Sequence, residues 1–244
     1  MRLIRVFVEA ALAEGAQIAA GGAAAAHMTR VLRLGRGDRV TLFNGDGGDY
    51  PAEILAIRGS RVQIAVLQRV PARPESPLAV TLVQGIARGD RMDLIVQKAT
   101  ELGAAAIQPV VTTRSVVRLD ARTAQRKLAH WRGIVIAACE QCGRAQLPEI
   151  SAPLPLPEWL ARPAAAARRL QLAVDSERPL GPAAAGAAVI ELLIGPEGGL
   201  DEDERHSAAN AGFRGCSIGP RVLRTETAAL AALTVLQAAA GDLR

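Results

Sequence analysis

The sequence predicts an α/β protein in two parts, a small domain of short β-strands followed by a larger domain with a mostly parallel sheet. In residues 1–70, short apolar stretches are separated by tight-turn signals, a pattern typical of a small barrel. The proline-rich stretch 71–77 then interrupts the apolar pattern. From Leu78 onward, strand patterns alternate with helical patterns, which favours a parallel sheet. We therefore expect domains over residues 1–72 and 73–244.

The composition fits a cytoplasmic protein with a large apolar core. Half of the 244 residues are apolar but only 2% are aromatic, so the core must consist mostly of Ala, Leu, Val and Ile. No apolar run is long enough to span a membrane, and Glu9 and Glu14 stand where a signal peptide would be apolar. The net charge of +5, carried almost entirely by arginine, suits a polyanionic partner. A genomic bias towards Arg and Ala codons would explain much of the same imbalance.

The first domain contains alternating strand and turn signals. Asn44-Gly45 and Asp46-Gly47 are strong signals for a tight turn between strands. The expected elements, in order, are a strand over residues 2–8, a helix over 23–34, and strands over 39–43, 50–57 and 62–70.

The second domain contains five expected strands, over residues 80–87, 105–111, 170–174, 189–194 and 213–218. Asp90, Asp120 and Asp201 are placed to cap helices, and Glu204 completes a capping box with Asp201. The stretches 151–168 and 178–188 are rich in Pro and Ala, and we expect surface connections there.

Two glycine turns dominate the C-terminal part of the chain. The strand over 189–194 ends at Gly195-Pro196-Glu197-Gly198-Gly199, and the strand over 213–218 ends at Gly219-Pro220. At the carboxyl ends of neighbouring parallel strands, two such turns would form a ligand crevice. Glycines let a backbone approach a ligand closely, although Gly-Pro pairs after strands are often only turns. The many charges of residues 221–227 favour a binding role for the second turn.

The last expected helix, over residues 225–240, has Thr225 placed to cap it. Its apolar residues Ala229, Leu233, Leu236 and Ala240 share one face, while Leu230 and Val235 lie on others. A helix that is apolar nearly all round must be buried, either in its own core or against a second copy. We therefore expect a homodimer.

The cysteines and histidines give little indication of a metal site. Cys139 and Cys142 form a single C-x-x-C pair within a helical pattern, and Cys216 is far away in the sequence. One pair without a second pair or matching histidines is a weak zinc signal. We expect reduced thiols, no metal, and no catalytic role for His27.

Five blocks of the sequence resemble motifs of the RsmE family. They are HMTRVLRLGRGDRVTLFNGDGGDY, QKATELGAAAIQPVVTTRSV, EQCGR, IGPEGGL and IGPRVLRTETA. These are SPOUT-class methyltransferases that use S-adenosylmethionine and act on 16S ribosomal RNA. The resemblance implies a PUA-like N-terminal barrel and a C-terminal α/β domain with a deep trefoil knot, a feature that residue patterns alone would not suggest.

The resemblance also implies the reaction. A methyl group would pass from S-adenosylmethionine to N3 of a specific uridine in 16S rRNA, leaving S-adenosylhomocysteine, without a metal. The alternative is a SPOUT methyltransferase that acts on a different rRNA or tRNA base. By the family pattern, the cofactor-binding residues are Ile194, Gly195, Gly199, Ile218, Gly219, Leu223, Arg224 and Thr227. Asp175, at another strand end, is a weaker candidate for contact with the ligand.

The candidate catalytic residues are Arg221, Arg224 and Glu226. An arginine near N3 would orient the uracil carbonyls and favour the deprotonated base. Glu226 and Glu197 are possible general bases, but either could instead pair with an arginine. The expected RNA-binding residues are Arg2, Arg5, Arg30, Arg33, Arg114 and Arg144. The expected partner is 16S rRNA, within the small ribosomal subunit.

Two other classes of protein are disfavoured. An RNA-binding module alone would need neither the two glycine turns nor a large α/β domain. A nucleotide- or phosphate-binding enzyme is weakened because G-x-x-x-x-G-K-[ST] and G-x-G-x-x-G are both missing from the sequence. Binding of S-adenosylmethionine, but not of ATP or NAD, would separate these classes.

Overall fold

The computed structural model describes residues 4–115, 120–163 and 168–243. The chain forms two compact units. The first contains residues 1–75 together with 136–147, and the second contains residues 76–135 together with 148–244. The division at residues 72 and 73 predicted above thus differs from these units, because the first unit includes a segment from the middle of the chain.

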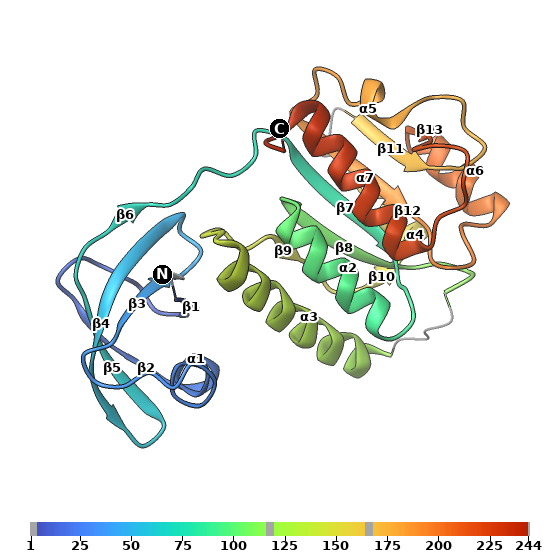
Figure 1. The fold of residues 1–244 in the computed structure, drawn as a ribbon. Coiled ribbons are helices and arrows are strands. Elements are labelled where there is room, and N and C mark those ends of the chain that lie inside the picture. Colours follow the sequence, from blue (N-terminus) through green and yellow to red (C-terminus); the bar gives the residue numbers. More distant parts are fainter. Residues whose placement is uncertain (1–3, 116–119, 164–167, 244) are drawn as a thin grey trace. The chain divides into compact units, whose positions relative to one another are not determined.

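The first unit is built on a six-stranded sheet (Figure 1). Its strands are β1 (Arg5–Phe7), β2 (Gln17–Ala20), β3 (Arg39–Phe43), β4 (Gly48–Arg58), β5 (Arg61–Val66) and β6 (Val70–Pro71). The order is β1-β3-β4-β5-β2, with β6 paired to β4, and only β1 and β3 run parallel among these pairs. A register shift between Ile54 and Ala56 marks an irregularity in β4. Met28, Leu42, Tyr50, Ile54 and Ile64 are fully buried in its core.

Several predictions for the first unit were right in kind but wrong in extent. The predicted helix over 23–34 is α1 (Gly22–Ala26), which continues as a π-helical turn over His27–Val31. The predicted strand over 62–70 is split into β5 and β6. Strand β2 was missed, because only one of its four residues is buried and its apolar pattern is weak.

The middle segment of the chain completes the first unit. Helix α3 (Ala121–Cys142) begins in the second unit, and its last turns belong to the first. There the Glu140 carboxylate accepts a hydrogen bond from the backbone N–H of Phe7 at 3.0 Å. The guanidinium of Arg5 donates to the carbonyl oxygen of Arg144 at 3.2 Å. Residues 136–147 therefore cover strand β1 as an integral part of this unit.

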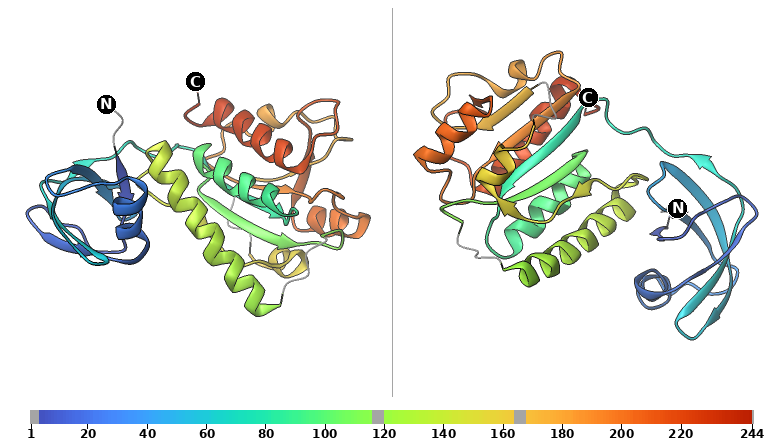
Figure 2. Two further views of the ribbon diagram at one scale, coloured as in Figure 1. Left: turned by 60° about the horizontal axis from the view of Figure 1, so that its bottom comes forward. Right: turned by 180° about the vertical axis from the view of Figure 1, so that it is seen from behind.

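The second unit is a seven-stranded sheet with helices on both faces (Figures 1 and 2). Its strands are β7 (Ala79–Gly85), β8 (Ala106–Val111), β9 (Glu149–Ile150), β10 (Leu154–Pro155), β11 (Arg168–Leu172), β12 (Val189–Ile194) and β13 (Phe213–Cys216). The order is β10-β8-β7-β12-β11-β13, with β9 paired to β8, and every pair is parallel. The predicted parallel sheet is therefore confirmed.

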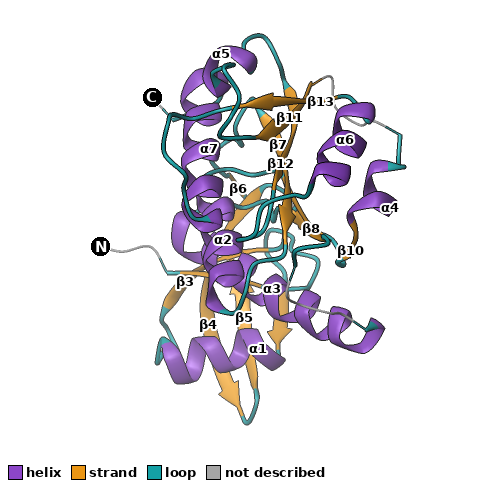
Figure 3. Ribbon diagram, turned by 90° about the vertical axis from the view of Figure 1, so that its right-hand side faces the viewer, coloured by secondary structure: helices purple, strands orange, loops and turns teal. Residues whose placement is uncertain are grey.

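The helices of this unit cover the sheet in two groups. They are α2 (Asp90–Glu101), the first part of α3, α4 (Leu156–Leu160), α5 (Leu180–Ala183), α6 (Glu202–Asn210) and α7 (Thr225–Ala240). Helices α2 and α7 pack together on one face, and α4 and α6 pack together on the other (Figure 3). Together they bury the central strands β7 and β12, whose residues are mostly apolar, as expected of a parallel sheet.

The stretches predicted as plain connections contain secondary structure. Residues 151–168 include β10 and α4, and residues 178–188 include α5; residues 164–167 lie outside the described residues. The Trp159 side chain of α4 packs against Phe213, with ring centroids 5.9 Å apart. These elements are short and rich in Pro and Ala, so their composition resembles that of a loop although they contribute to the core.

Helix ends were predicted with mixed success. The capping box of Asp201 and Glu204 is present, and the backbone N–H of Thr123 donates to the Asp120 carboxylate at 2.7 Å. Asp90, by contrast, is the first residue of α2, and Gly89 with φ of 52° precedes it as the cap. A positive φ at this junction requires glycine rather than aspartate.

Helix α7 has the predicted bounds, but the rest of the chain already covers much of its apolar surface. Ala229, Leu233 and Leu236 are buried within the unit, where α7 contacts α2 and α5. Leu230 and Val235 remain half-buried. None of the helices within the described ranges could cross a lipid bilayer.

Candidate functional site

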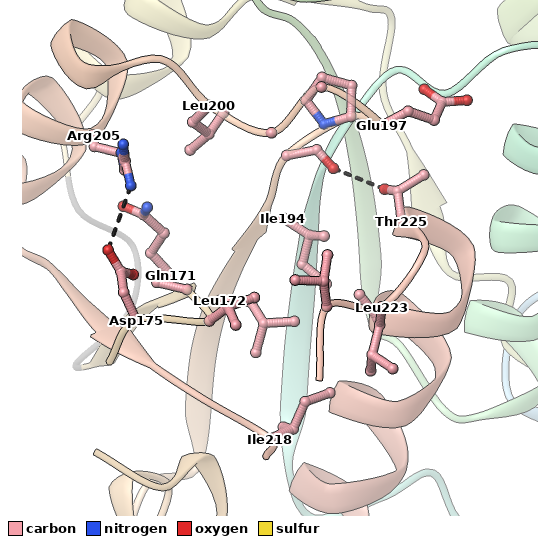
Figure 4. A pocket seen from close by; sticks show the side chains of 18 of the residues that line it. Gln171, Leu172, Asp175, Ile194, Glu197, Leu200, Arg205, Ile218, Leu223 and Thr225 are labelled. Carbon is pink, nitrogen blue, oxygen red and sulfur yellow. Dashed lines mark hydrogen bonds and ion pairs between the residues drawn. The ribbon is translucent and has the colours of Figure 1, made fainter. Parts of the chain in front are cut away.

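A cavity of about 500 Å³ opens at the carboxyl ends of strands β11, β12 and β13 (Figure 4). Three chain segments form most of its wall, residues 171–175, 194–200 and 218–223. This volume lies in the range of small-molecule sites. The cavity is therefore positioned where a parallel sheet usually places its ligand.

The strand order corrects the predicted crevice. Strand β11 lies between β12 and β13, so the two glycine turns do not follow neighbouring strands. The end of β11 contributes Gln171, Leu172 and Asp175 to the space between them. Asp175, a weak candidate by sequence, lines the cavity and lies 3.6 Å from the guanidinium of Arg205. Order along the chain gave no indication of this insertion, because a crossover can place a strand at a distance from its predecessor.

The first glycine loop, defined here as residues 195–199, is packed tightly against the end of strand β7. A Cβ atom placed on Gly85 would lie 2.5 Å from Cδ of Pro196, and one on Gly195 would lie 2.9 Å from the backbone nitrogen of Leu200. Gly199 has φ of 69°, a conformation that other residues rarely adopt. The glycines therefore permit a close backbone turn that larger residues would open.

Thr225 ties this loop to the start of α7. Its hydroxyl donates to the carbonyl oxygen of Gly195 at 2.7 Å and accepts from the side-chain amide of Gln84 at 2.9 Å. The predicted role of Thr225 as helix cap was wrong, since Arg224 occupies the cap position and makes no side-chain capping bond. The hydroxyl forms a long-range hydrogen bond instead of a local one.

A second set of bonds holds the other end of the first glycine loop. Glu204 of the capping box accepts hydrogen bonds from the backbone N–H groups of Thr113 at 2.7 Å and Asp201 at 3.0 Å. The hydrogen bond from the backbone of Glu204 lowers the pKa of Asp201. Arg114, which follows Thr113, donates to the carbonyl oxygen of Gly198 at 2.8 Å and lines the cavity. Arg114 is thus part of the cavity wall.

Two glutamates near the cavity, Glu197 and Glu226, are paired with Arg91 of α2. Its guanidinium lies 3.0 Å from Glu197 and 3.7 Å from Glu226. Burial acts to raise the pKa of Glu197, but hydrogen bonds from the backbone N–H of Arg88 and from Arg91 outweigh it, so the pKa is lowered. A lowered pKa makes Glu197 a poor proton acceptor. Glu226 does not line the cavity, and one of its carboxylate oxygens is buried without a hydrogen-bond partner among the described residues.

The predicted cofactor residues fall into two groups. Six of them line the cavity: Ile194, Gly195, Gly199, Ile218, Gly219 and Leu223. Arg224 and Thr227 are exposed and lie outside its wall. Of the two predicted catalytic arginines, Arg221 lines the cavity and Arg224 does not.

Two of the predicted RNA-binding arginines have structural partners in the first unit. Arg5 is buried, pairs with Asp49 at 2.6 Å and lies over the ring of Phe43. It therefore does not supply the surface charge that was expected of it. Arg144 pairs with Glu75 at 2.6 Å and is mostly buried.

The other predicted RNA-binding arginines differ in position. Arg30 and Arg33 are exposed on and just after the π-helical turn, and Arg33 has an unusual positive φ of 55°. Arg2 lies outside the described residues. A basic surface on the first unit would thus depend on arginines such as Arg30 and Arg33 rather than on Arg5.

The cysteine pair lacks the features of a reactive or metal-binding site. Burial raises the pKa of the Cys139 thiol to about 12, so the thiol is protonated at neutral pH. Cys142 is half-buried and Cys216 is buried. No group of three or more His, Cys, Asp or Glu residues within the described ranges could hold a metal ion.

The features of the cavity fit S-adenosylmethionine. Leu172, Ile218 and Leu223 offer apolar surface to a purine ring, and the glycine loops expose backbone groups that can recognise its edge. Asp175, whose side chain is 76% exposed, could accept hydrogen bonds from ribose hydroxyls.

Comparisons with known proteins identify both parts of the chain. Residues 74–237 match the RNA methyltransferase domain family, and residues 21–67 match the RNA methyltransferase PUA domain family. The sequence is 31% identical to ribosomal RNA small subunit methyltransferase E of Buchnera aphidicola, over 99% of this chain and 98% of that protein. It is 31% identical to the Bacillus subtilis protein of that name, over 86% of this chain and 85% of that protein.

Two solved structures share the whole fold. A methyltransferase of Legionella pneumophila with bound S-adenosylmethionine is 38% identical, with a TM-score of 0.92 and complete coverage of both chains. Ribosomal RNA small subunit methyltransferase E of Neisseria gonorrhoeae, also bound to S-adenosylmethionine, is 35% identical, with a TM-score of 0.92 and complete coverage.

The fold, the cavity and these matches define the class of the protein as an RNA methyltransferase with an N-terminal PUA domain. The chain matches the Buchnera protein over 98% of that protein and the Bacillus protein over 85%. The chain belongs to the ribosomal RNA small subunit methyltransferase E family.

Proposed function

We propose that this protein transfers the methyl group of S-adenosylmethionine to N3 of a specific uridine in 16S rRNA. The observation that carries the proposal is the cavity between the two glycine loops, in a chain whose relatives are named as small-subunit rRNA methyltransferases and are solved with this cofactor. Without a metal in the proposed chemistry, catalysis depends on positioning the two reactants, excluding water and removing the N3 proton.

The cofactor would be held by the first glycine loop and by a second glycine loop, defined here as residues 219–223. Ile194, Gly195 and Gly199 line one side of the cavity, and Ile218, Gly219 and Leu223 line the other. When bound, S-adenosylmethionine supplies an activated methyl group on a sulfonium, so the protein need not activate the donor. The rigid turn at Gly195 would fix the cofactor relative to the second loop, where the target is expected.

The target base would be oriented by Arg221 and Arg224. Both side chains are exposed, and neither has a side-chain partner among the described residues. A guanidinium beside the uracil carbonyls would hold the ring and favour the N3 anion electrostatically. We do not assign the proton acceptor to Glu226 or Glu197, because both are paired with Arg91.

The PUA domain would hold the RNA outside the target nucleotide. Exposed arginines such as Arg30 and Arg33 can bind phosphates without reading sequence. We propose that the substrate is 16S rRNA within the small ribosomal subunit. This substrate would place the protein with ribosomes in the cytoplasm.

Two structural features belong to the same proposal. We propose a homodimer, in which a second copy covers the apolar residues that remain near the second glycine loop; Val222 is 83% exposed there. We also propose that the chain between β11 and α7 is threaded as a deep trefoil knot. Light scattering at micromolar concentration tests the dimer, since a stable monomer would contradict it.

Mapping of methylated nucleotides tests the reaction and its alternatives. The purified protein and radiolabelled cofactor would be incubated in separate reactions with each of four substrates: small subunits, free 16S rRNA, 23S rRNA and tRNA. We expect N3-methyluridine at one position of 16S rRNA. Methylation of another base, or of 23S rRNA or tRNA instead, would identify a methyltransferase with a different target.

A further inference from the structure

The side chain of Gln84, at the end of strand β7, is fully buried next to the cofactor cavity without lining it. Its amide nitrogen faces three oxygen atoms: the carbonyl of Gly85 at 2.9 Å, the hydroxyl of Thr225 at 2.9 Å and the carbonyl of Gly195 at 3.4 Å. Its amide oxygen is buried with no hydrogen-bond partner among the described residues. Gln84 therefore acts only as a donor.

A buried acceptor without a partner is destabilising, because it loses its hydrogen bonds to water and gains none in return. An apolar side chain of similar shape would avoid this cost. The value of Gln84 must therefore lie in where its donated hydrogen bonds hold other groups, and not in the stability of the unit alone.

These hydrogen bonds determine how the first glycine loop is oriented. Gln84 donates to the Thr225 hydroxyl. That hydroxyl in turn donates to the carbonyl oxygen of Gly195 at 2.7 Å (Figure 4). The Gly195 carbonyl is thus engaged by the protein, and the turn that follows it is closed by a backbone hydrogen bond from Gly199 to Pro196 at 2.8 Å. The start of the loop is thus held by hydrogen bonds from within the protein.

We propose that Gln84 is a positioning residue of the cofactor site, which acts through Thr225 and Gly195 and touches no ligand. It connects three elements that are far apart in the sequence, namely strand β7, the first glycine loop and helix α7. Without it, the loop would sample other orientations and the cofactor would have to order it on binding. The proposal rests on S-adenosylmethionine as cofactor.

The first test compares two buried glutamines in the same unit. Gln237 is as fully buried as Gln84, accepts from the Ser76 hydroxyl at 2.6 Å and donates to the Gly103 carbonyl at 3.2 Å. We expect Gln84→Met to weaken S-adenosylmethionine binding roughly tenfold to hundredfold by calorimetry, with little loss of melting temperature. Gln237→Met should lower the melting temperature and leave cofactor affinity unchanged. Equal effects of the two variants on affinity would overturn the proposal.

The second test examines the hydroxyl through which Gln84 acts. Thr225→Val keeps the shape of the side chain but removes the hydroxyl, and should weaken cofactor binding as Gln84→Met does. Thr225→Ser keeps the hydroxyl and should bind closer to the wild type. Thr234 of the same helix donates only to the carbonyl of Leu230, so Thr234→Val is the control. Additive losses in the Gln84→Met/Thr225→Val double variant would show that the two residues act independently, against the proposal.

The third test uses pH. In Gln84→Glu, an ionised carboxylate would face the carbonyl oxygens of Gly85 and Gly195 and could not donate to them. Burial and these oxygens would raise its pKa, and the protonated acid could donate one hydrogen bond again. Cofactor affinity of this variant should therefore improve between about pH 8 and about pH 5.5, relative to the wild type. If the ratio of variant to wild-type cofactor affinity did not change with pH, the role of Gln84 as a donor would be contradicted.

Hydrogen exchange on the unliganded protein provides a readout that does not involve the cofactor. The amides of residues 197–200 should exchange faster in Gln84→Met than in the wild type, while those of α6 should not change. If Gln84→Met fails to fold, Gln84→Glu at both pH values supplies the same comparison. Failure of the wild type to bind S-adenosylmethionine would refute the cofactor assignment, and unchanged exchange would refute the positioning role.

Discussion

The two glycine loops that face each other across the cavity differ in how the protein holds them. The first, residues 195–199, receives hydrogen bonds from Gln84, Thr225 and Arg114. Its Glu197 also accepts from the backbone of Arg88 and the guanidinium of Arg91. The contact between Gly85 and Pro196 adds close packing. Nearly every part of this loop is attached to another element.

The second glycine loop, residues 219–223, is open by comparison. Val222 is 83% exposed, and Arg221 has no side-chain partner within the described ranges. Gly219 has φ of 125° with nothing near its Cβ position. Arg224, whose side chain is exposed, follows the loop directly.

This difference indicates a division of labour between the loops. A preformed loop lowers the entropic cost of cofactor binding, because the backbone groups are already in position. An open loop with unpaired arginines leaves room for a macromolecule, either the RNA or a second copy of the chain. Both inferences can be tested by substitutions that make the two loops more alike or more different.

The largest expected effect is at Arg224, beside the open loop. Arg224→Ala should lower the methyl-transfer rate about a hundredfold while leaving cofactor affinity nearly intact, because one electrostatic donor to the uracil is removed. Arg224→Lys should not restore the rate, since lysine lacks the planar pair of donors. Single-turnover rates at saturating RNA measure this effect. A normal rate at saturation with weaker RNA binding would instead identify a phosphate contact.

A smaller effect is expected when the packing of the first loop is broken. In Gly85→Ala, the new methyl group would lie 2.5 Å from Pro196, so the loop must move. We expect a loss of about 1–3 kcal/mol in the free energy of unfolding and roughly tenfold weaker cofactor binding. The control is Gly133→Ala in helix α3, where nothing lies near the Cβ position and no loss of stability is expected. Unchanged affinity in Gly85→Ala would show that the close contact does not matter for the cofactor.

The ion pairs of Arg91 should matter less, because its side chain is 40% exposed and solvent screens the charges. Arg91→Met should cost under about 1 kcal/mol of stability at neutral pH and weaken cofactor binding only a few-fold. The lowered pKa of Glu197 sets the sign of the pH effect: its stabilising contribution is present above the ordinary value of 4.5 and is lost as the pH falls through the lower, folded-state value. The melting temperatures of wild type and Arg91→Met should therefore converge in acid. A gap that widens in acid would contradict the pairing.

The smallest effect on stability is expected at Val222 in the open loop. Val222→Ser removes an exposed apolar side chain and should change the free energy of unfolding by less than about 0.5 kcal/mol. If a second copy covers this loop, the same variant should shift the dimer towards monomer in light scattering. A large drop in melting temperature without a shift in mass would mean that Val222 is buried in the chain's own fold.

Local signals in the sequence were sufficient for much of the fold. The capping box at Asp201 and Glu204, the bounds of α7 and the strand over residues 189–194 all depend on residues within a few positions of one another. The six predicted residues that line the cavity also lie within two short motifs. Such features can be predicted because their cause lies close by in the sequence.

Features set by distant residues could not be predicted in this way. Thr225 bonds to Gly195, 30 residues away, and not to its own helix. Arg5 pairs with Asp49, 44 residues away. It is therefore a buried ion-pair partner and not the surface charge that the sequence suggested. Gln84 belongs to none of the sequence motifs described above. A distinguishing signal would have been a polar residue at the end of an otherwise apolar strand, directly before a glycine.

The segment 136–147, which completes the first unit, has a consequence for the order of folding during synthesis. When residue 75 leaves the ribosome, two hydrogen-bond acceptors of strand β1 have not yet been made. They are the Glu140 carboxylate, which accepts from the Phe7 N–H, and the Arg144 carbonyl, which accepts from the Arg5 guanidinium. We expect a nascent chain stalled with about 100 residues emerged to be cut readily by protease within strand β1, and one with about 160 emerged to resist. The first unit is thus finished only after residues 76–135 of the second unit have been translated.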